Sequence, residues 1–242
     1  MVRAADGKGV NVNDLVLVQG MDATRRTLRR YQDRPVPTLA PWAALSLVIT
    51  VLLLFSVWVV AKIVPVDVTA VPINGVSYTP DFRDYLHILT RNSLVLALHA
   101  LACVAGFIAG SSMPLSAANR SGLDRWVHEK AGPAAIVFVT GATLFSLCTQ
   151  SYYLGGLAAQ IANQLDMPPA LLVAGLLPHA IPELVVLFMP LAAWLIASHK
   201  NRWDELLAAT AVCVAVAVPV LLAAAAIELW VSPRLVTHLA GI

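Results

Sequence analysis

The chain has 242 residues, of which 59% are hydrophobic and only 12% are charged, and its mean hydropathy is +0.76. A single soluble domain cannot cover that much apolar surface, so we expect the lipid bilayer to be the main solvent. The net charge is only +2 and the aromatic content 7%, which argues against a basic groove with stacking side chains for nucleic acid. We therefore predict an all-α integral membrane protein without a nucleic-acid partner.

Residues 1–41 form a polar, basic tail that we place in the cytoplasm. Within it, Val12–Tyr31 is predicted to be a helix, and four arginines cluster on it at helical spacing: Arg25, Arg26, Arg29 and Arg30. Such a cluster beside a membrane attracts anionic lipid or contacts a partner, although it can equally serve only to set the orientation of the chain. The prolines at 35, 37 and 41 are expected to break the chain before the first span.

Five apolar segments are each long enough to cross about 30 Å of hydrocarbon as a helix. They comprise residues 42–63, 93–111, 134–158, 178–198 and 206–230. With five crossings, twelve Lys and Arg residues fall on the side of the N-terminus and four on the other side. The positive-inside rule then predicts a multi-pass protein with the N-terminus inside and the C-terminus outside. The first segment is too long and too late for a cleaved signal peptide, so we expect it to be retained.

The outer connection at 64–92 is the longest segment outside the membrane after the tail. Val66–Tyr78, which contains Asn74-Gly75, could form a small hairpin. Thr79-Pro80-Asp81 is a helix-start signal. The apolar residues that follow it have helical spacing and predict an amphipathic helix in the outer interface that leads into the second span: Phe82, Tyr85, Leu86 and Leu89.

Two further patterns concern the packing of one helix and the continuity of another. Gly106 and Gly110, in the second span, have the spacing that allows two helices to approach closely. Pro168-Pro169 opens an apolar run of about ten residues that is too short to cross the membrane and that predicts a re-entrant half helix at 168–177. The alternative is one long, proline-kinked helix from Pro168 to Ser198.

Few ionisable residues lie within the spans, and each charged one costs roughly 2.5 to 3.5 kcal/mol on insertion scales, so each needs an explanation. They are His99, His179, Glu183 and Glu228. In the predicted topology all four fall in the outer half of the bilayer. Gln150 and Ser151 reach the same depth, and Asn92 lies where the second span begins. We therefore expect one polar layer that could bind a ligand or partner.

His179 and Glu183 are four residues apart and so share one helix face. They could form a hydrogen-bonded structural pair that also satisfies backbone groups freed by Pro178 and Pro182, or they could form a functional site. A catalytic metal usually takes three protein ligands, and only His99 or Glu228 could supply a third. No zincin, nucleophile-elbow, P-loop or dinucleotide motif is present. We therefore predict no metal, cofactor or catalytic residue.

The stretch Leu177-Pro178-His179-Ala180-Ile181-Pro182-Glu183-Leu184 resembles the signature of the stage II sporulation protein M family. The resemblance extends to Phe82–Asn92, where an asparagine opens a span, and to Ile227-Glu228 followed by Pro233, so it covers roughly 82–233. Ala180 stands where the family usually has glycine, and Pro182 and Pro190 interrupt a region normally rich in small residues.

The resemblance implies a multispanning protein of the cytoplasmic (inner) membrane that works in assemblies, with an ATPase or with an envelope-remodelling or export component. We therefore expect a non-enzymatic membrane subunit, either a scaffold or permease-like, that can also self-associate. The alternative is an intramembrane hydrolase or peptide-processing enzyme that uses His179 and Glu183.

Overall fold

The computed structural model describes residues 16–66, 80–117 and 120–242, and every regular element in these ranges is helical. The elements are α1 (Val16–Asp33), α2 (Pro35–Ile63), α3 (Phe82–Phe107), η2 (Ile108–Ser112), α4 (Met113–Ala117), α5 (Gly122–Gln164), α6 (Pro169–His199), η3 (Trp203–Glu205), α7 (Leu206–Ala226), η4 (Ile227–Val231) and α8 (Ser232–Ala240). The expected hairpin at Val66–Tyr78 lies almost wholly outside the described residues. The all-α prediction is confirmed for the described part of the chain.

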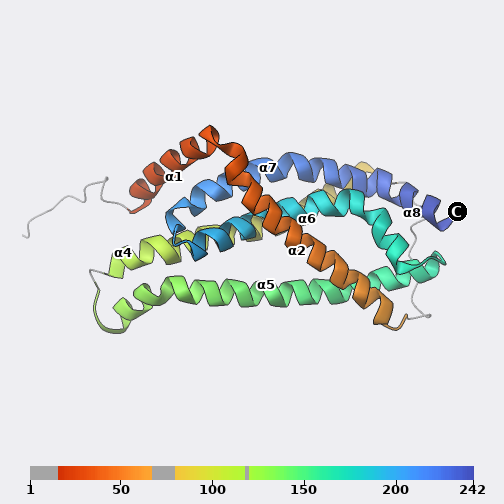
Figure 1. Cartoon of the computed structure of the whole chain (residues 1–242), viewed down its shortest axis with the longest axis horizontal. Coiled ribbons are helices and arrows are strands. Elements are labelled where there is room, and N and C mark those ends of the chain that lie inside the picture. The colour runs from red at the N-terminus through yellow and green to blue at the C-terminus, as the bar shows by residue number, and fades with distance from the viewer. Residues whose placement is uncertain (1–15, 67–79, 118–119) are drawn as a thin grey trace, which may run out of the picture.

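Five helical segments in the described ranges are long and apolar enough to cross a membrane, and they form one elongated bundle (Figure 1). They are Pro35–Ile63, Phe82–Ser112, Gly122–Gln164, Pro169–His199 and Trp203–Ala240. The prediction of five potential spans is therefore confirmed, and their apolar surfaces are consistent with contact with a lipid bilayer. The helices extend beyond the apolar runs because hydropathy marks only the part of a helix that lies in hydrocarbon, whereas polar turns continue it.

Helix α3 illustrates this extension, since it starts at Phe82, before the apolar run. Asp81 caps it by accepting hydrogen bonds from the backbone N–H groups of Arg83 and Asp84, and the Asp84 side chain accepts one from the N–H of Asp81. This reciprocal arrangement satisfies donors that the first helical turn leaves free. The predicted amphipathic segment is therefore the beginning of the same continuous helix as the second span.

The break between α1 and α2 comes at Arg34, which is earlier than expected. Pro35 and Pro37 lie in the first turn of α2, where backbone N–H groups have no intrahelical acceptor and proline costs little. Pro41 lies inside the helix. The expectation that all three prolines precede the first helix was therefore wrong.

Helix α6 runs without interruption from Pro169 to His199, and the structure does not support the re-entrant half helix expected at 168–177. It corresponds to the alternative of one long helix, and Figure 1 shows that it bends in its N-terminal half. Pro178 and Pro182 lie inside it, and each removes one backbone hydrogen bond, which is the usual cause of such a kink.

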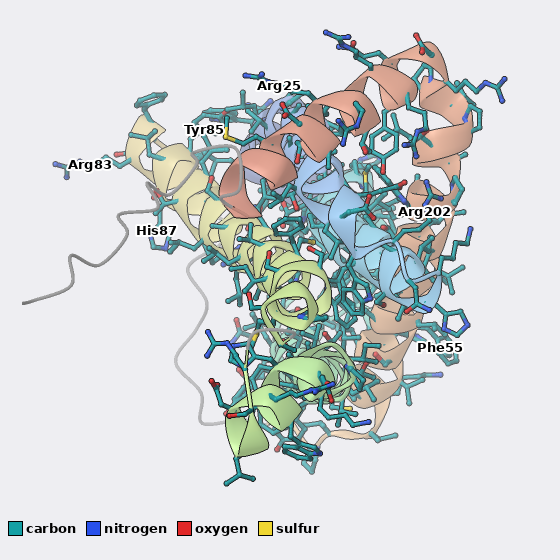
Figure 2. All side chains as sticks on the ribbon, turned by 90° about the vertical axis from the view of Figure 1, so that its left-hand side faces the viewer. Arg25, Phe55, Arg83, Tyr85, His87 and Arg202 are labelled. Atoms are coloured by element: carbon teal, nitrogen blue, oxygen red, sulfur yellow. The ribbon has the colours of Figure 1, made fainter. Side chains whose placement is uncertain are left out.

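Helix α6 is also the centre of the bundle. About 56% of its most apolar window is buried, against 6% for that of α5, which lies along one edge (Figure 1). Helices α2, α3 and α7 surround α6. Large apolar side chains elsewhere face outward, such as Phe55 of α2, which points away from the bundle in Figure 2. The outer surface is therefore built for lipid or for other apolar partners.

The two glycines of the second span face tryptophan rings. A Cβ atom added to Gly106 would lie 2.3 Å from Nε1 of Trp194, and one added to Gly110 would lie 2.0 Å from Cδ2 of Trp203. Both distances are far below van der Waals contact, so the predicted close packing at this motif is present, with tryptophan rings of α6 and η3 as the partners.

A neighbouring pair of glycines on α5 provides a test of how this helix is held. A Cβ atom on Gly155 would lie 2.5 Å from Cβ of Val60 on α2, whereas one on Gly156 would meet nothing within 4 Å. We expect Gly155→Ala to lower the free energy of unfolding by about 1 to 3 kcal/mol through overpacking, and Gly156→Ala to raise it by up to about 1 kcal/mol through the higher helix propensity of alanine. Unfolding of both variants in mixed micelles measures the difference, and equal stabilities would show that α5 is not held by this contact.

Candidate functional site

Polar side chains from three elements meet at the end of the bundle that carries the C-terminus. We use the name carboxylate cluster for Arg91 and Asn92 of α3, Glu183 of α6, and Glu228 of η4. Nη2 of Arg91 lies 3.5 Å from Oε1 of Glu228. The Asn92 side chain lies beside Glu183, and the two carboxylates are close enough to repel each other. The predicted outer-layer residues Asn92, Glu183 and Glu228 are thus brought together.

The packing of α3 against α7 explains why these residues meet. The Tyr85 hydroxyl donates a hydrogen bond of 3.0 Å to the backbone oxygen of Leu222, and its ring stacks on Trp230 with centroids 5.4 Å apart. Two turns further along α3, Arg91 and Asn92 come level with Glu228. Glu228 itself lies in a π-helical turn, a wider form that re-aims side chains and is frequent at functional sites.

The cluster contains polar atoms that are buried without a partner of normal hydrogen-bond geometry. These are Oε2 of Glu183, Oε2 of Glu228 and Nδ2 of Asn92. Asn92 is only 3% exposed. Arg91 is the only basic member of the carboxylate cluster, and 61% of its side chain is exposed. Buried carboxylate oxygens without donors are costly, so this arrangement favours a site that receives a donor group.

The structure pairs His179 with Ser232 of α8, not with Glu183. Nδ1 of His179 and Oγ of Ser232 are 2.7 Å apart. A histidine beside a serine hydroxyl is also the arrangement of a base and a nucleophile, but Ser232 is only 2% exposed and a substrate could not reach it. The contact instead ties α6 to the start of α8.

Two other predicted site residues lie apart from the carboxylate cluster. Nδ1 of His99 is 2.7 Å from the backbone oxygen of Leu187, one helical turn beyond Glu183, and its ring packs near Phe188. Gln150 donates to Oγ of Ser146 on its own helix. His99 therefore satisfies a backbone carbonyl, which is a structural role, and Gln150 lies on the edge helix α5.

Within the described ranges, no three His, Cys, Asp or Glu side chains are grouped closely enough to hold a metal ion. The cluster offers two carboxylates and an amide. These groups can accept hydrogen bonds from an amine, a guanidinium group or a backbone N–H.

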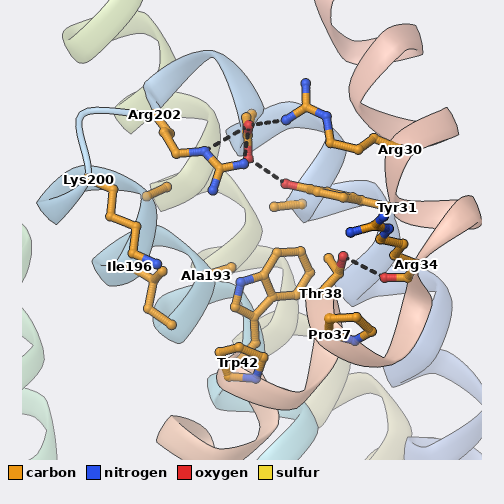
Figure 3. A pocket seen from close by; sticks show the side chains of 14 residues that line it. Arg30, Tyr31, Arg34, Pro37, Thr38, Trp42, Ala193, Ile196, Lys200 and Arg202 are labelled. Atoms are coloured by element: carbon orange, nitrogen blue, oxygen red, sulfur yellow. Dashed lines mark hydrogen bonds and ion pairs between the residues drawn. The ribbon is translucent and has the colours of Figure 1, made fainter.

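A second polar site lies at the opposite end of the bundle. We use the name Glu205 network for Glu205 and its three hydrogen-bond donors, Arg30, Tyr31 and Arg202 (Figure 3). Nη1 of Arg30 is 2.7 Å from Oε1 of Glu205, the Tyr31 hydroxyl is 2.9 Å from Oε2, and Nε of Arg202 is 2.9 Å from Oε1. Since α7 separates Glu205 from Glu228, the two sites are about 35 Å apart at the helical rise.

Two members of the Glu205 network, Glu205 and Tyr31, are buried, whereas the two arginines are partly exposed to water. Glu205 is 7% exposed and Tyr31 is 8% exposed. Burial and the adjacent Glu205 carboxylate raise the pKa of Tyr31 well above its ordinary value. Tyr31 therefore remains a hydrogen-bond donor to Glu205 at neutral pH, and the network attaches α1 to the start of α7.

The four clustered arginines of the tail have different environments. Arg30 binds Glu205, whereas Arg25 lies 4.0 Å from Asp22 and is exposed, as are Arg26 and Arg29. Figure 2 shows Arg25 pointing away from the bundle. Sequence reasoning missed Glu205, although a carboxylate just before an apolar span and beside Lys200 and Arg202 is a signal that could have found it.

No protein-family model matches the chain, and the comparisons found neither a curated protein nor a solved structure that is similar to it.

Proposed function

We propose that the chain is a non-enzymatic subunit of a membrane complex, whose carboxylate cluster binds a cationic or hydrogen-bond-donating group. That group belongs to a polar segment of a partner or to a small polar solute. The observation that carries the proposal is the pair of buried oxygens, Oε2 of Glu183 and Oε2 of Glu228, that have no donor of normal hydrogen-bond geometry; the Asn92 amide lies beside Glu183 without completing such a bond. When both neighbouring carboxylates are ionised, the one exposed arginine leaves a net negative charge, and an incoming cation would favour this state and neutralise it.

We further propose that the N-terminus is cytoplasmic and the C-terminus is outside, in the cell membrane. The support is the distribution of basic residues, twelve against four. In this orientation the carboxylate cluster lies nearer the outer face and the Glu205 network lies at the cytoplasmic face. The resemblance to the stage II sporulation protein M family favours an ATPase or an envelope-remodelling or export component as the partner. The exposed faces of α5 offer a surface for that partner or for a second copy of the chain.

The orientation has a direct test in single cysteines placed in a cysteine-free background. Cysteines at Asn74 and Thr237 should react with an impermeant thiol reagent added to intact cells, whereas one at Ser121 should react only after the membrane is opened. Reaction of the Ser121 position in intact cells would reverse the proposed topology.

The function is tested by purifying the tagged full chain from its native membranes and identifying the proteins that accompany it. Glu183→Gln keeps the shape of the side chain and removes its charge, so it should lose the partner or abolish complementation in cells. Asp204→Asn is the control, because Asp204 is an exposed acidic residue of η3, away from the cluster and from α5. Normal partner binding and complementation in Glu183→Gln would refute the proposed role of the cluster.

A further inference from the structure

A cavity of about 210 Å³ lies between the start of α2 and the end of α6, next to the Glu205 network (Figure 3). Four basic side chains line it: Arg30, Arg34, Lys200 and Arg202. Glu205 is the only carboxylate among its described lining residues. Four cations and one anion leave a net charge of +3 around a space with room for several water molecules.

The four basic side chains around this cavity differ in whether they form an ion pair. Glu205 is shared by Arg30 and Arg202. Arg34 and Lys200 form no ion pair with any residue in the described ranges. They lie on opposite sides of the cavity, Arg34 before α2 and Lys200 after α6 (Figure 3). Two free cations that face one space form a site for an anion.

The remaining wall of the cavity is apolar. Trp42 is 6% exposed, and its ring meets Tyr31 edge to face at 5.5 Å. Ala193 and Ala209, both buried, line the interior, and their small side chains leave the space open. Trp42 is also where the apolar run of the first span begins, so the cavity lies at the boundary between the polar and apolar parts of the bundle. Phosphate groups of lipids occupy this level of a bilayer.

We propose that this cavity binds a phosphate ester of net negative charge, with Arg34 and Lys200 as its main ligands and Trp42 beside the ester's apolar part. Arginine can bind two phosphate oxygens at once, and lysine adds a point charge. The proposal is independent of the carboxylate cluster, which lies at the other end of the bundle. The phosphate can come from an anionic phospholipid or from a soluble phosphate compound, and the apolar wall favours the lipid.

The test uses the purified full chain, washed free of lipid in a neutral detergent. Its melting temperature is measured against short-chain phosphatidylglycerol, short-chain phosphatidylcholine and inorganic phosphate. A ligand that binds only the folded chain raises the melting temperature with its concentration. We expect phosphatidylglycerol to give the largest rise. A rise with inorganic phosphate that phosphatidylglycerol does not exceed would instead identify a soluble phosphate as the ligand of the same site.

Variants show whether the cavity is responsible. Arg34→Gln and Lys200→Gln should each weaken the apparent affinity roughly tenfold, the cost of one charge-assisted contact. Both side chains are exposed and unpaired, so neither change should prevent folding. The control is Arg83→Gln with Arg234→Gln, which removes two charges from exposed positions at the other end of the bundle and should leave the affinity nearly unchanged. Equal weakening in the control pair and the cavity pair, or equal shifts with phosphatidylglycerol and phosphatidylcholine, would overturn the proposal.

Discussion

Glu205→Ala should lower the free energy of unfolding by about 3 kcal/mol, because this one carboxylate joins α1 to the start of α7. Its removal leaves the buried Tyr31 hydroxyl without its acceptor and takes the counterion from Arg30 and Arg202. Breaking a buried ion pair from one side costs about 3 to 5 kcal/mol. The side chains of the two arginines are 57% and 46% exposed, so water compensates part of their loss and places the effect at the lower end.

Unfolding in mixed micelles measures this loss, and Asp204→Asn is the matched control. Asp204 is the preceding residue, also acidic but exposed, and its change should stay within about 0.5 kcal/mol. Glu205→Gln keeps one acceptor oxygen for the network and should lie between the two. If Glu205→Ala and Asp204→Asn unfold alike, the network does not hold α1 to the bundle.

The sequence predicted the helical class and the number of potential spans because both depend on local hydropathy over about 20 residues. The predicted helix boundaries were wrong at proline, because this residue type is compatible with two local structures. Proline after Arg34 signals a break when it follows a helix, but it is equally suited to the first turn of the next one. In α6, Pro178 suggested the end of one helix and the start of the next, whereas the structure accommodates Pro178 and Pro182 within one bent helix that neighbouring helices surround.

The candidate site was predicted in part. The common level of Asn92, Glu183 and Glu228 along the bundle follows from the helical rise and the number of spans. The structure brings these three residues together in the carboxylate cluster. Their partners could not be read from the sequence: His179 and Glu183 share a helix face by spacing, yet the bend in α6 and the position of α8 give His179 a serine as its partner. The Glu205 network was missed because Tyr31 and Glu205 are far apart in the sequence, and no local pattern joins them.

The carboxylate cluster differs from the Glu205 network in how well its members are satisfied. Both oxygens of Glu205 accept hydrogen bonds, whereas Glu183 and Glu228 each keep one buried oxygen without a donor. A buried carboxylate that stabilises the fold is expected to accept hydrogen bonds with both oxygens, as Glu205 does. Residues that serve binding often cost stability in the free protein. The two sites should therefore respond in opposite ways to the loss of a carboxylate.

Glu183→Gln should accordingly leave the free energy of unfolding within about 1 kcal/mol of the parent, with any change toward higher stability, while partner binding is lost. The amide has the same shape, and it removes a buried charge that no described residue neutralises directly. His179→Ala should do the reverse and lower stability by about 1 to 3 kcal/mol, since the buried Ser232 hydroxyl loses its partner. Melting of both variants in detergent, measured beside co-purification of the partner, separates the two effects. If Glu183→Gln destabilised the chain as much as His179→Ala, the cluster would be a structural element of the bundle and not its binding site.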